Sequence, residues 1–155
     1  MDEKTLRSII EEVIKEFTAG SGGTATAVAT APSVSSASGS LQISDAGPAE
    51  RGTNPREVVI ALAPGFGGRM NHTIIDVDHG DVLREVCAGI EEQGLSYRFI
   101  RVYRTADVGF IAHEAAKLSG SGIGIGIQSR GTTVIHQKDL PPLSNLELFS
   151  QSPLI

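Results

Sequence analysis

The chain has 155 residues, enough for one compact domain and some additional segments. Its formal net charge is −5 and no cluster of basic side chains is visible, so the sequence argues against a nucleic-acid partner. The single cysteine, Cys87, excludes an internal disulfide, and no apolar run reaches the roughly 20 residues that a membrane helix requires. The N-terminus also lacks the basic start and apolar core of a secretory signal, so we expect a soluble cytoplasmic protein without membrane contact.

Residues 1–18 are predicted to form an amphipathic helix. Asp2 and Glu3 suit the start of a helix dipole, and Gly20 is a typical stop. Because a helix of this length is marginal in water by itself, its apolar stripe needs a partner surface. The stripe recurs at three- and four-residue spacing and consists of Leu6, Ile9, Ile10, Val13, Ile14 and Phe17.

Residues 19–50 are predicted to be a disordered linker. Ala, Gly, Ser, Thr and Pro dominate, and only Asp45 and Glu50 are charged, so the segment cannot bury enough apolar surface to offset its ordering entropy. A flexible chain of this length spans roughly 30 Å. The leading helix can therefore dock away from the folded domain, which we favour, or fold back onto it.

Residues 51–155 are predicted to form the folded domain. Short apolar runs rich in β-branched residues alternate with amphipathic stretches, an arrangement typical of layered α/β folds. We expect a three-layer α/β/α domain with a mixed, mostly parallel sheet, in which a tight turn makes the last two strands antiparallel. The predicted strands are 57–63, 98–103, 122–128 and 132–137, and the predicted helices are 81–93 and 107–118.

The third predicted strand alternates glycine with isoleucine. Neighbouring side chains of a strand point to opposite faces, so Gly122, Gly124 and Gly126 leave one face of this strand without side chains. Glycine destabilises a strand, and three on one face indicate close approach of a packed helix, a partner subunit or a flat ligand. The residues alone favour the helix or the subunit over the ligand. A dinucleotide-binding motif is excluded, because the chain continues into a turn and another strand.

Several reactive residue types occur without the arrangement that a site needs. Cys87 falls on the apolar stripe of a predicted helix, and His136 lies within a predicted strand, as structural histidines do. No Ser-His-Asp or Cys-His set is apparent. We assign no catalytic and no metal-binding residue, because a carboxylate-rich loop and helix N-cap explains the one acidic cluster better than a metal site does. That cluster comprises Asp76, Asp78, His79 and Asp81.

Binding loops of α/β proteins usually lie at the ends of the strands, and two charged residues are predicted there. Asp107 opens a helix directly after a strand, and Arg130 lies in the turn of the antiparallel pair. Arg130 could bind an anionic ligand group, although a solvated arginine is the commoner case in a turn. The Pro141-Pro142 loop is also expected at one end of the sheet.

The exact amino-acid sequence of three stretches is more specific than these patterns. "LREVCAGIEEQGLSYRFIR", "LSGSGIGIGIQSRGTTVIHQ" and "LPPLSNLELF" closely resemble the medium subunit of the coenzyme B12-dependent propanediol and glycerol dehydratases. The resemblance runs from about Glu57 to the end and is most specific between Ser119 and Phe149. The helix and linker resemble the N-terminal extension of forms packaged in bacterial microcompartments.

This resemblance implies a lyase made of large, medium and small subunits that converts 1,2-propanediol or glycerol to an aldehyde. Adenosylcobalamin would lie between this chain and the large barrel subunit, pressed against the bare glycine face and the loops at its rim. Residues 1–18 would bind the shell or cargo of a microcompartment. The positions that match the family's cofactor contacts are Asp107, Arg130, Leu143 and Asn145.

The sequence departs from the family pattern in three places. Lysine is usual at the position of Arg130, and proline at that of Ser150. Family members also continue for several tens of residues beyond Ile155, so we expect apolar surface to be exposed here.

Two other interpretations stay open. The small subunit of the dehydratase-reactivating factor, a chaperone, resembles the same domain, and "LREVCAGIEEQG" suits both proteins. The Gly-Ile strand and "LPPLSNLELF" favour the dehydratase. The third possibility is an unrelated scaffold domain with a docking helix.

Overall fold

The strand β1, which pairs with a neighbour on each side, is apolar along almost its whole length because helices cover both of its faces. The computed structural model describes residues 41, 43–44 and 46–151. The predicted helix 1–18 lies outside the described residues, as does the linker up to residue 40. The elements are β1 (Glu57–Leu62), α2 (His79–Glu92), β2 (Ser96–Arg101), α3 (Val108–Leu118), β3 (Ile123–Ile127), β4 (Thr133–Gln137) and β5 (Glu147–Phe149).

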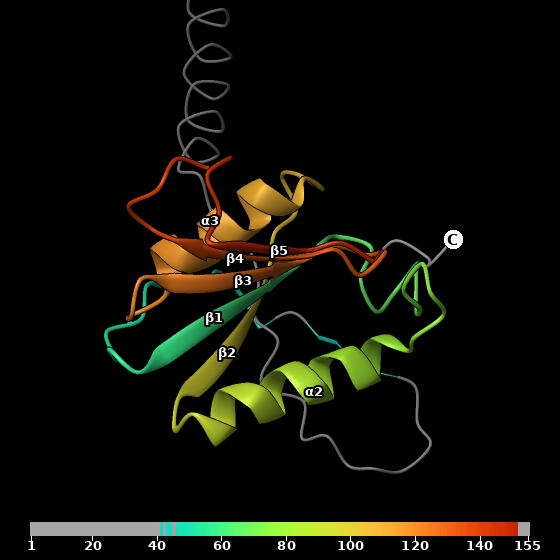
Figure 1. Ribbon diagram of the computed structural model, residues 1–155, viewed down its shortest axis with the longest axis horizontal. Coiled ribbons are helices and arrows are strands. Elements are labelled where there is room, and N and C mark those ends of the chain that lie inside the picture. Colours follow the sequence, from blue (N-terminus) through green and yellow to red (C-terminus); the bar gives the residue numbers. More distant parts are fainter. Residues whose placement is uncertain (1–40, 42, 45, 152–155) are drawn as a thin grey trace, which may run out of the picture.

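The sheet has the strand order β2-β1-β3-β4-β5 (Figure 1). β1 pairs in parallel with β2 and β3, while β4 is antiparallel to both β3 and β5. The chain crosses from β1 to β2 in one direction along the sheet and from β2 to β3 in the other. Because both crossovers are expected to be right-handed, they place α2 and α3 on opposite faces. The predicted three-layer α/β/α architecture with a mixed sheet is confirmed.

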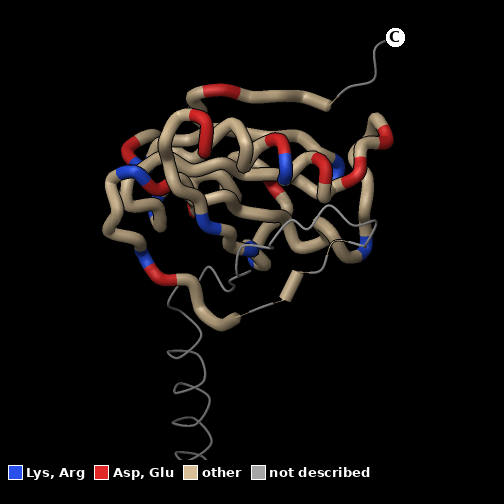
Figure 2. The backbone as a smooth tube through the Cα atoms, turned by 90° about the horizontal axis from the view of Figure 1, so that it is seen from below, with Lys and Arg blue, Asp and Glu red and all other residues tan. Residues whose placement is uncertain are grey.

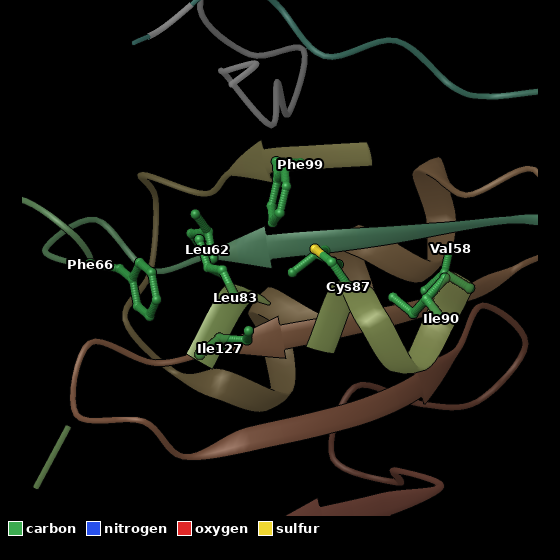
Figure 3. Close-up of a cluster of buried hydrophobic side chains, with 9 residues drawn as sticks. Val58, Leu62, Phe66, Leu83, Cys87, Ile90, Phe99 and Ile127 are labelled. Atoms are coloured by element: carbon green, nitrogen blue, oxygen red, sulfur yellow. The ribbon is translucent and has the colours of Figure 1, made fainter. Parts of the chain in front are cut away.

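Alternate residues of β1 feed two separate cores. On the α2 side, Val58, Ile60 and Leu62 join a cluster with Leu83, Cys87, Ile90, Phe99 and Ile127, most of which Figure 3 shows. On the α3 side, Val59 and Ala61 pack with residues of β2 and α3. Leu41 and Ile43, the first described residues, pack against the α2-side cluster.

The bare glycine face of β3 lies under α3. A Cβ atom added to Gly124 would stand 2.2 Å from the backbone nitrogen of Ala116, and one added to Gly126 would stand 2.6 Å from that of Ala112. Glycine on the strand and alanine on the helix therefore let two backbones approach closely. At Gly124 and Gly126 helix packing is confirmed, and the expectation that this face presses against a cofactor ring is wrong. Gly122 precedes β3, and a Cβ added there would stand 3.0 Å from the Lys138 side chain instead.

The other differences from the sequence prediction are local. The second strand begins two residues earlier than predicted and ends at Arg101. β5 lies in a stretch that we predicted to be a loop, and all three of its residues are exposed. A strand this short carries no periodic signal, and its conformation comes from pairing with β4. Among the described helices, none has the length and hydropathy needed to cross a membrane.

The glycine contact yields a stability prediction. Gly124→Ala should lower the free energy of unfolding by about 3 kcal/mol, because the added methyl group meets backbone that can move only with the helix. Gly89→Ala is the matched control: Gly89 is exposed within α2, nothing lies within 4 Å of an added Cβ, and alanine should stabilise the helix by about 0.5–1 kcal/mol. Urea unfolding measures both, and similar effects of the two variants would contradict the packing account.

Candidate functional site

Three loops meet at the edge of the sheet where the parallel strands end. The segments that follow β1, β2 and β3 (63–78, 102–107 and 128–132) leave the sheet at this edge because the three strands run in the same direction. We call it the carboxyl edge. Ligands of open α/β sheets bind outside this edge, at the point where the crossovers diverge to opposite faces.

A buried arginine fixes the first of these loops. The Nη1 atom of Arg101 donates to the carbonyl oxygens of Ala63, Pro64 and Phe66 at 2.8, 3.1 and 2.9 Å. The side chain is 8% exposed. Three neutral acceptors thus solvate its charge in place of water. Arg101 follows two apolar residues, Phe99 and Ile100, and precedes Val102, which could have indicated a buried arginine, and our prediction missed this role.

His79 joins the loop after β1 to the turn after β3. Its ring stacks on Phe66 with centroids 3.9 Å apart, and Nδ1 accepts a hydrogen bond from the Gly67 amide at 3.0 Å. The other nitrogen, Nε2, therefore carries the proton and donates to the carbonyl oxygen of Ser129 at 2.8 Å. Burial lowers the pKa of His79 below its ordinary value, although the bond to Ser129 opposes that shift.

The acidic cluster around His79 serves the start of α2, as the N-cap interpretation predicted. Asp78 is the N-cap, and its Oδ1 accepts from the Gly80 amide at 2.7 Å. Asp81 forms an ion pair with Arg84, and Asp76 has a positive φ of 63°. Within the part of the chain that the structure describes, no group of three or more His, Cys, Asp or Glu residues could hold a metal ion.

Asp107 stands at the carboxyl edge as the N-cap of α3. Its Oδ1 accepts from the amides of Gly109 and Phe110 at 2.9 and 3.4 Å. The side chain is exposed, and these capping bonds use only one carboxylate oxygen. Arg104, three residues earlier, forms an ion pair with buried Glu114, which ties the loop after β2 to the helix that follows it.

Arg130 stands at the same edge in the turn between β3 and β4. Its side chain is exposed and has no ion pair among the described residues. Its carbonyl oxygen accepts from the Ile74 amide at 2.9 Å, and Gln128 Nε2 donates to the Ala106 carbonyl at 3.3 Å. The turn is thus bonded to the loops that follow β1 and β2, so Asp107 and Arg130 share one edge.

The loop between β4 and β5 brings Leu143 to the start of α3. An added Cβ on Gly109 would stand 3.1 Å from the Pro142 carbonyl oxygen, 3.3 Å from Asp107 Oδ1 and 3.9 Å from Leu143 Cδ2. Leu143 is 75% exposed. Asn145 is also exposed in this loop, but no contact among the described residues joins its side chain to the other three candidates.

The exposed apolar side chains of the described residues gather at the carboxyl edge, in the β4–β5 loop and on β5, whereas Lys and Arg are interspersed with Asp and Glu (Figure 2). Between α2 and the outer strands lies an apolar groove of about 410 Å³, with Phe149 and Ile135 on the sheet side and Val82 and Val86 on the helix side. Exposed apolar surface was predicted from the sequence. The exposed residues are Met70, Ile74, Ile75, Val77, Tyr103, Phe110, Leu143, Leu146, Leu148 and Phe149.

The single cysteine takes no part in this site. Cys87 is 5% exposed in the α2-side core, and burial raises the pKa of its thiol to about 11. The thiolate, which is the reactive form, is therefore scarce at neutral pH. The prediction of an inert core cysteine is confirmed.

Residues 63–155 match the family described as "Dehydratase medium subunit". The chain belongs to the dehydratase medium-subunit family. The matched span includes the three loops of the carboxyl edge and all four predicted cofactor contacts, so the family identity that the three sequence stretches suggested is confirmed.

Two solved structures are also similar to this chain. One is a glycerol dehydratase reactivase, with 23% sequence identity and a TM-score of 0.49, covering 59% of this chain and 71% of that one. The other is a diol dehydratase-reactivating factor complexed with ADP and Mg²⁺, with 28% identity and a TM-score of 0.46, covering 60% and 72%.

The bonding of His79 gives a pH prediction. A proton on Nδ1 would face the Gly67 amide donor, so the folded protein favours the neutral ring, whereas the unfolded chain takes up a proton near the ordinary pKa of 6.5. The unfolded state then binds more protons below this pH, and the free energy of unfolding should fall as pH drops from 7.5 to 5.5. His113, whose pKa burial also lowers, acts in the same direction.

Urea unfolding at several pH values tests this prediction. His79→Asn can still accept from Gly67 and does not titrate, so its stability should depend less on pH than that of the wild type. An equal slope in both proteins would show that His79 does not carry the effect.

Proposed function

We propose that this chain is the medium subunit of an adenosylcobalamin-dependent diol dehydratase. In this role it helps a large catalytic subunit to bind the cofactor, for conversion of 1,2-propanediol or glycerol to the aldehyde. The supporting observation is that the family match covers a carboxyl edge at which an exposed carboxylate and an exposed guanidinium, both with unused hydrogen-bonding capacity, stand beside exposed apolar side chains.

The four candidate residues fit the chemistry of a corrin ring, which carries amide side arms around a broad apolar face. The oxygen of Asp107 that the helix cap leaves free can accept from an amide N–H, and Arg130 can donate to an amide oxygen. Leu143 offers an apolar contact, and the amide of Asn145 can both donate and accept. When bound, the cofactor supplies the radical by cleavage of its cobalt–carbon bond, while these side chains bind and orient it.

Three of the four described histidines are committed to contacts within the domain, which supports a binding rather than a catalytic role. His79 is committed to backbone bonds under the loop after β1, and His136 is fully buried beside the carbonyl oxygens of Gln137 and Pro142. His113 packs against His136. The fourth, His72, is exposed and its Nε2 lies 3.9 Å from Asp78 Oδ2. The chemistry of the reaction is then assigned to the large subunit, which holds the substrate.

The proposed partners are the large and small dehydratase subunits, and the exposed apolar residues at the carboxyl edge and on β5 support such contacts. Residues 1–18 are proposed to bind the shell or cargo of a bacterial microcompartment, with residues 19–50 as the tether to the domain 51–155. The protein would then be cytoplasmic and enclosed in that compartment.

The alternative functions differ in the partner that they require. A small subunit of the dehydratase-reactivating factor would copurify with an ATPase-like large subunit. A dehydratase medium subunit would copurify with a barrel-type large subunit and a corrinoid. A scaffold domain would bind no corrinoid with either.

The cofactor contacts can be tested in the coexpressed dehydratase complex. Asp107→Ser with Arg130→Ala should raise the Kd for adenosylcobalamin at least about tenfold, because two hydrogen bonds to charged groups are lost. Serine keeps the helix cap, so the fold is preserved. Absorbance of the bound corrinoid measures the loss.

The matched control for this double variant is Arg51→Ala with Glu92→Ala. It also removes one exposed cation and one exposed anion, but at the opposite edge of the sheet. Its affinity for adenosylcobalamin should equal that of the wild type. An equal rise of Kd in both double variants would count against a site at the carboxyl edge.

Deleting residues 1–18 should change where the protein is found without preventing assembly with the other subunits. The deletion leaves the described domain intact and removes only the predicted docking helix. Cell fractionation and copurification measure the two outcomes, and an unchanged distribution between fractions would refute the docking role.

A further inference from the structure

The loop that carries Leu143 and Asn145 has few backbone donors with which to attach itself to the domain. Pro141 and Pro142 have no amide N–H, so two successive residues cannot donate to the body of the protein. The Ser144 amide donates within the loop, to the Pro141 carbonyl oxygen at 2.9 Å. The Lys138 amide donates to Gly122 and the Leu146 amide to Ile135, but between these two residues the loop depends on donors from elsewhere that reach its carbonyl oxygens.

His136 can be such a donor. It lies on β4 at 0% exposure, and its Nε2 atom stands 3.1 Å from the Pro142 carbonyl oxygen. Nδ1 stands 2.8 Å from the carbonyl oxygen of Gln137, the next residue in the chain. A neutral imidazole donates from only one nitrogen. The Gln137 carbonyl oxygen also accepts from the Leu140 amide at 3.2 Å, whereas no backbone amide of the described residues donates to that of Pro142.

The Pro142 carbonyl group also contacts the start of α3. A Cβ on Gly109 would stand 3.1 Å from that oxygen, and the Gly109 amide donates to Asp107. Glycine lets the loop approach the capped turn closely. The position of Pro142 thus determines how near Leu143 lies to Asp107.

We propose that His136 is a positioning residue for the candidate cofactor site, which donates from Nε2 to the Pro142 carbonyl and holds the loop of Leu143 and Asn145 beside Asp107. The proposal rests on the proposed function for its effect on cofactor affinity. The hydrogen bond to the loop can be tested independently of that function.

Three substitutions separate the two ring nitrogens. Gln places an amide N–H near the position of Nε2, Asn places one near that of Nδ1, and Phe keeps the ring without a donor. Deuterium uptake by the amides of residues 143–146 is measured in the full chain. The Kd for adenosylcobalamin is measured in the complex coexpressed with the large and small dehydratase subunits.

His136→Phe and His136→Asn should raise the amide uptake and raise Kd about threefold to tenfold, as expected for one hydrogen bond. His136→Gln should stay close to the wild type in both measurements. Equal behaviour of the Gln and Asn variants, or unchanged uptake in both, would overturn the proposal.

The uptake measurement keeps this test distinct from that of the proposed function. If the wild-type complex binds no corrinoid, the proposed function fails, and the order of the Gln and Asn variants in amide uptake still decides whether His136 holds the loop. A His136→Phe variant that does not fold leaves that comparison intact.

Discussion

Direct contact between the backbones of α3 and β3 sets the geometry on which the candidate site depends. With glycine at 124 and 126 facing alanines of α3, no side chain larger than a methyl group separates the helix from the strand at these positions. The height of α3 over the sheet then fixes the Asp107 turn at its N-terminal end. It also fixes His113, whose ring stands 5.0 Å from that of His136 on β4. The strand glycines thus act on the site from beneath the helix rather than by touching a ligand.

Buried polar side chains hold the carboxyl edge in place above this packing. Arg101 binds three carbonyl oxygens of the loop after β1, and His79 links that loop to the turn after β3. Each of these groups would be costly to bury without partners, and among the described side chains no buried polar atom lacks one. Arg101, His79 and His136 are buried and bonded to backbone carbonyl or amide groups, whereas His72 and Asp107 stay exposed. The backbone of the carboxyl edge is thus held by buried side chains, while Asp107 and Arg130 remain exposed on its loops.

Periodic and local signals made part of this structure predictable. The run from Glu57 to Ala63 is β-branched and apolar because β1 is covered on both faces, and Asp107 caps α3 because a carboxylate after a strand suits a helix start. The glycines of β3 predicted a close approach but not its partner, since residues 112–116 come to lie against that strand only in the folded protein. Helix packing and ligand contact both favour glycine at alternate positions of a strand, so a single sequence does not distinguish them.

The contacts that the prediction missed all join residues far apart in the chain. Arg101 reaches back 35 residues to the Phe66 carbonyl, and His79 reaches Ser129, 50 residues away. Neither distance leaves a pattern in composition or spacing. β5 was missed for a related reason, because a three-residue strand exists only through its pairing with β4. The exact amino-acid sequence of whole stretches indicated the family, which the periodicity of apolar residues could not do.

Exposure of the candidate side chains explains why such a site would be shared between subunits. Asp107 and Arg130 both face solvent, where hydrogen bonds to charged groups compete with water and contribute little. A second surface that covers the carboxyl edge would exclude water and strengthen each of these bonds, since electrostatic interactions grow as the effective dielectric falls. The same covering would bury Ile74, Phe110 and Leu143, whose apolar surface stabilises an interface more than it stabilises the isolated chain. Under the proposed function, partner binding and cofactor binding are therefore one thermodynamic event, in which each increases the affinity for the other.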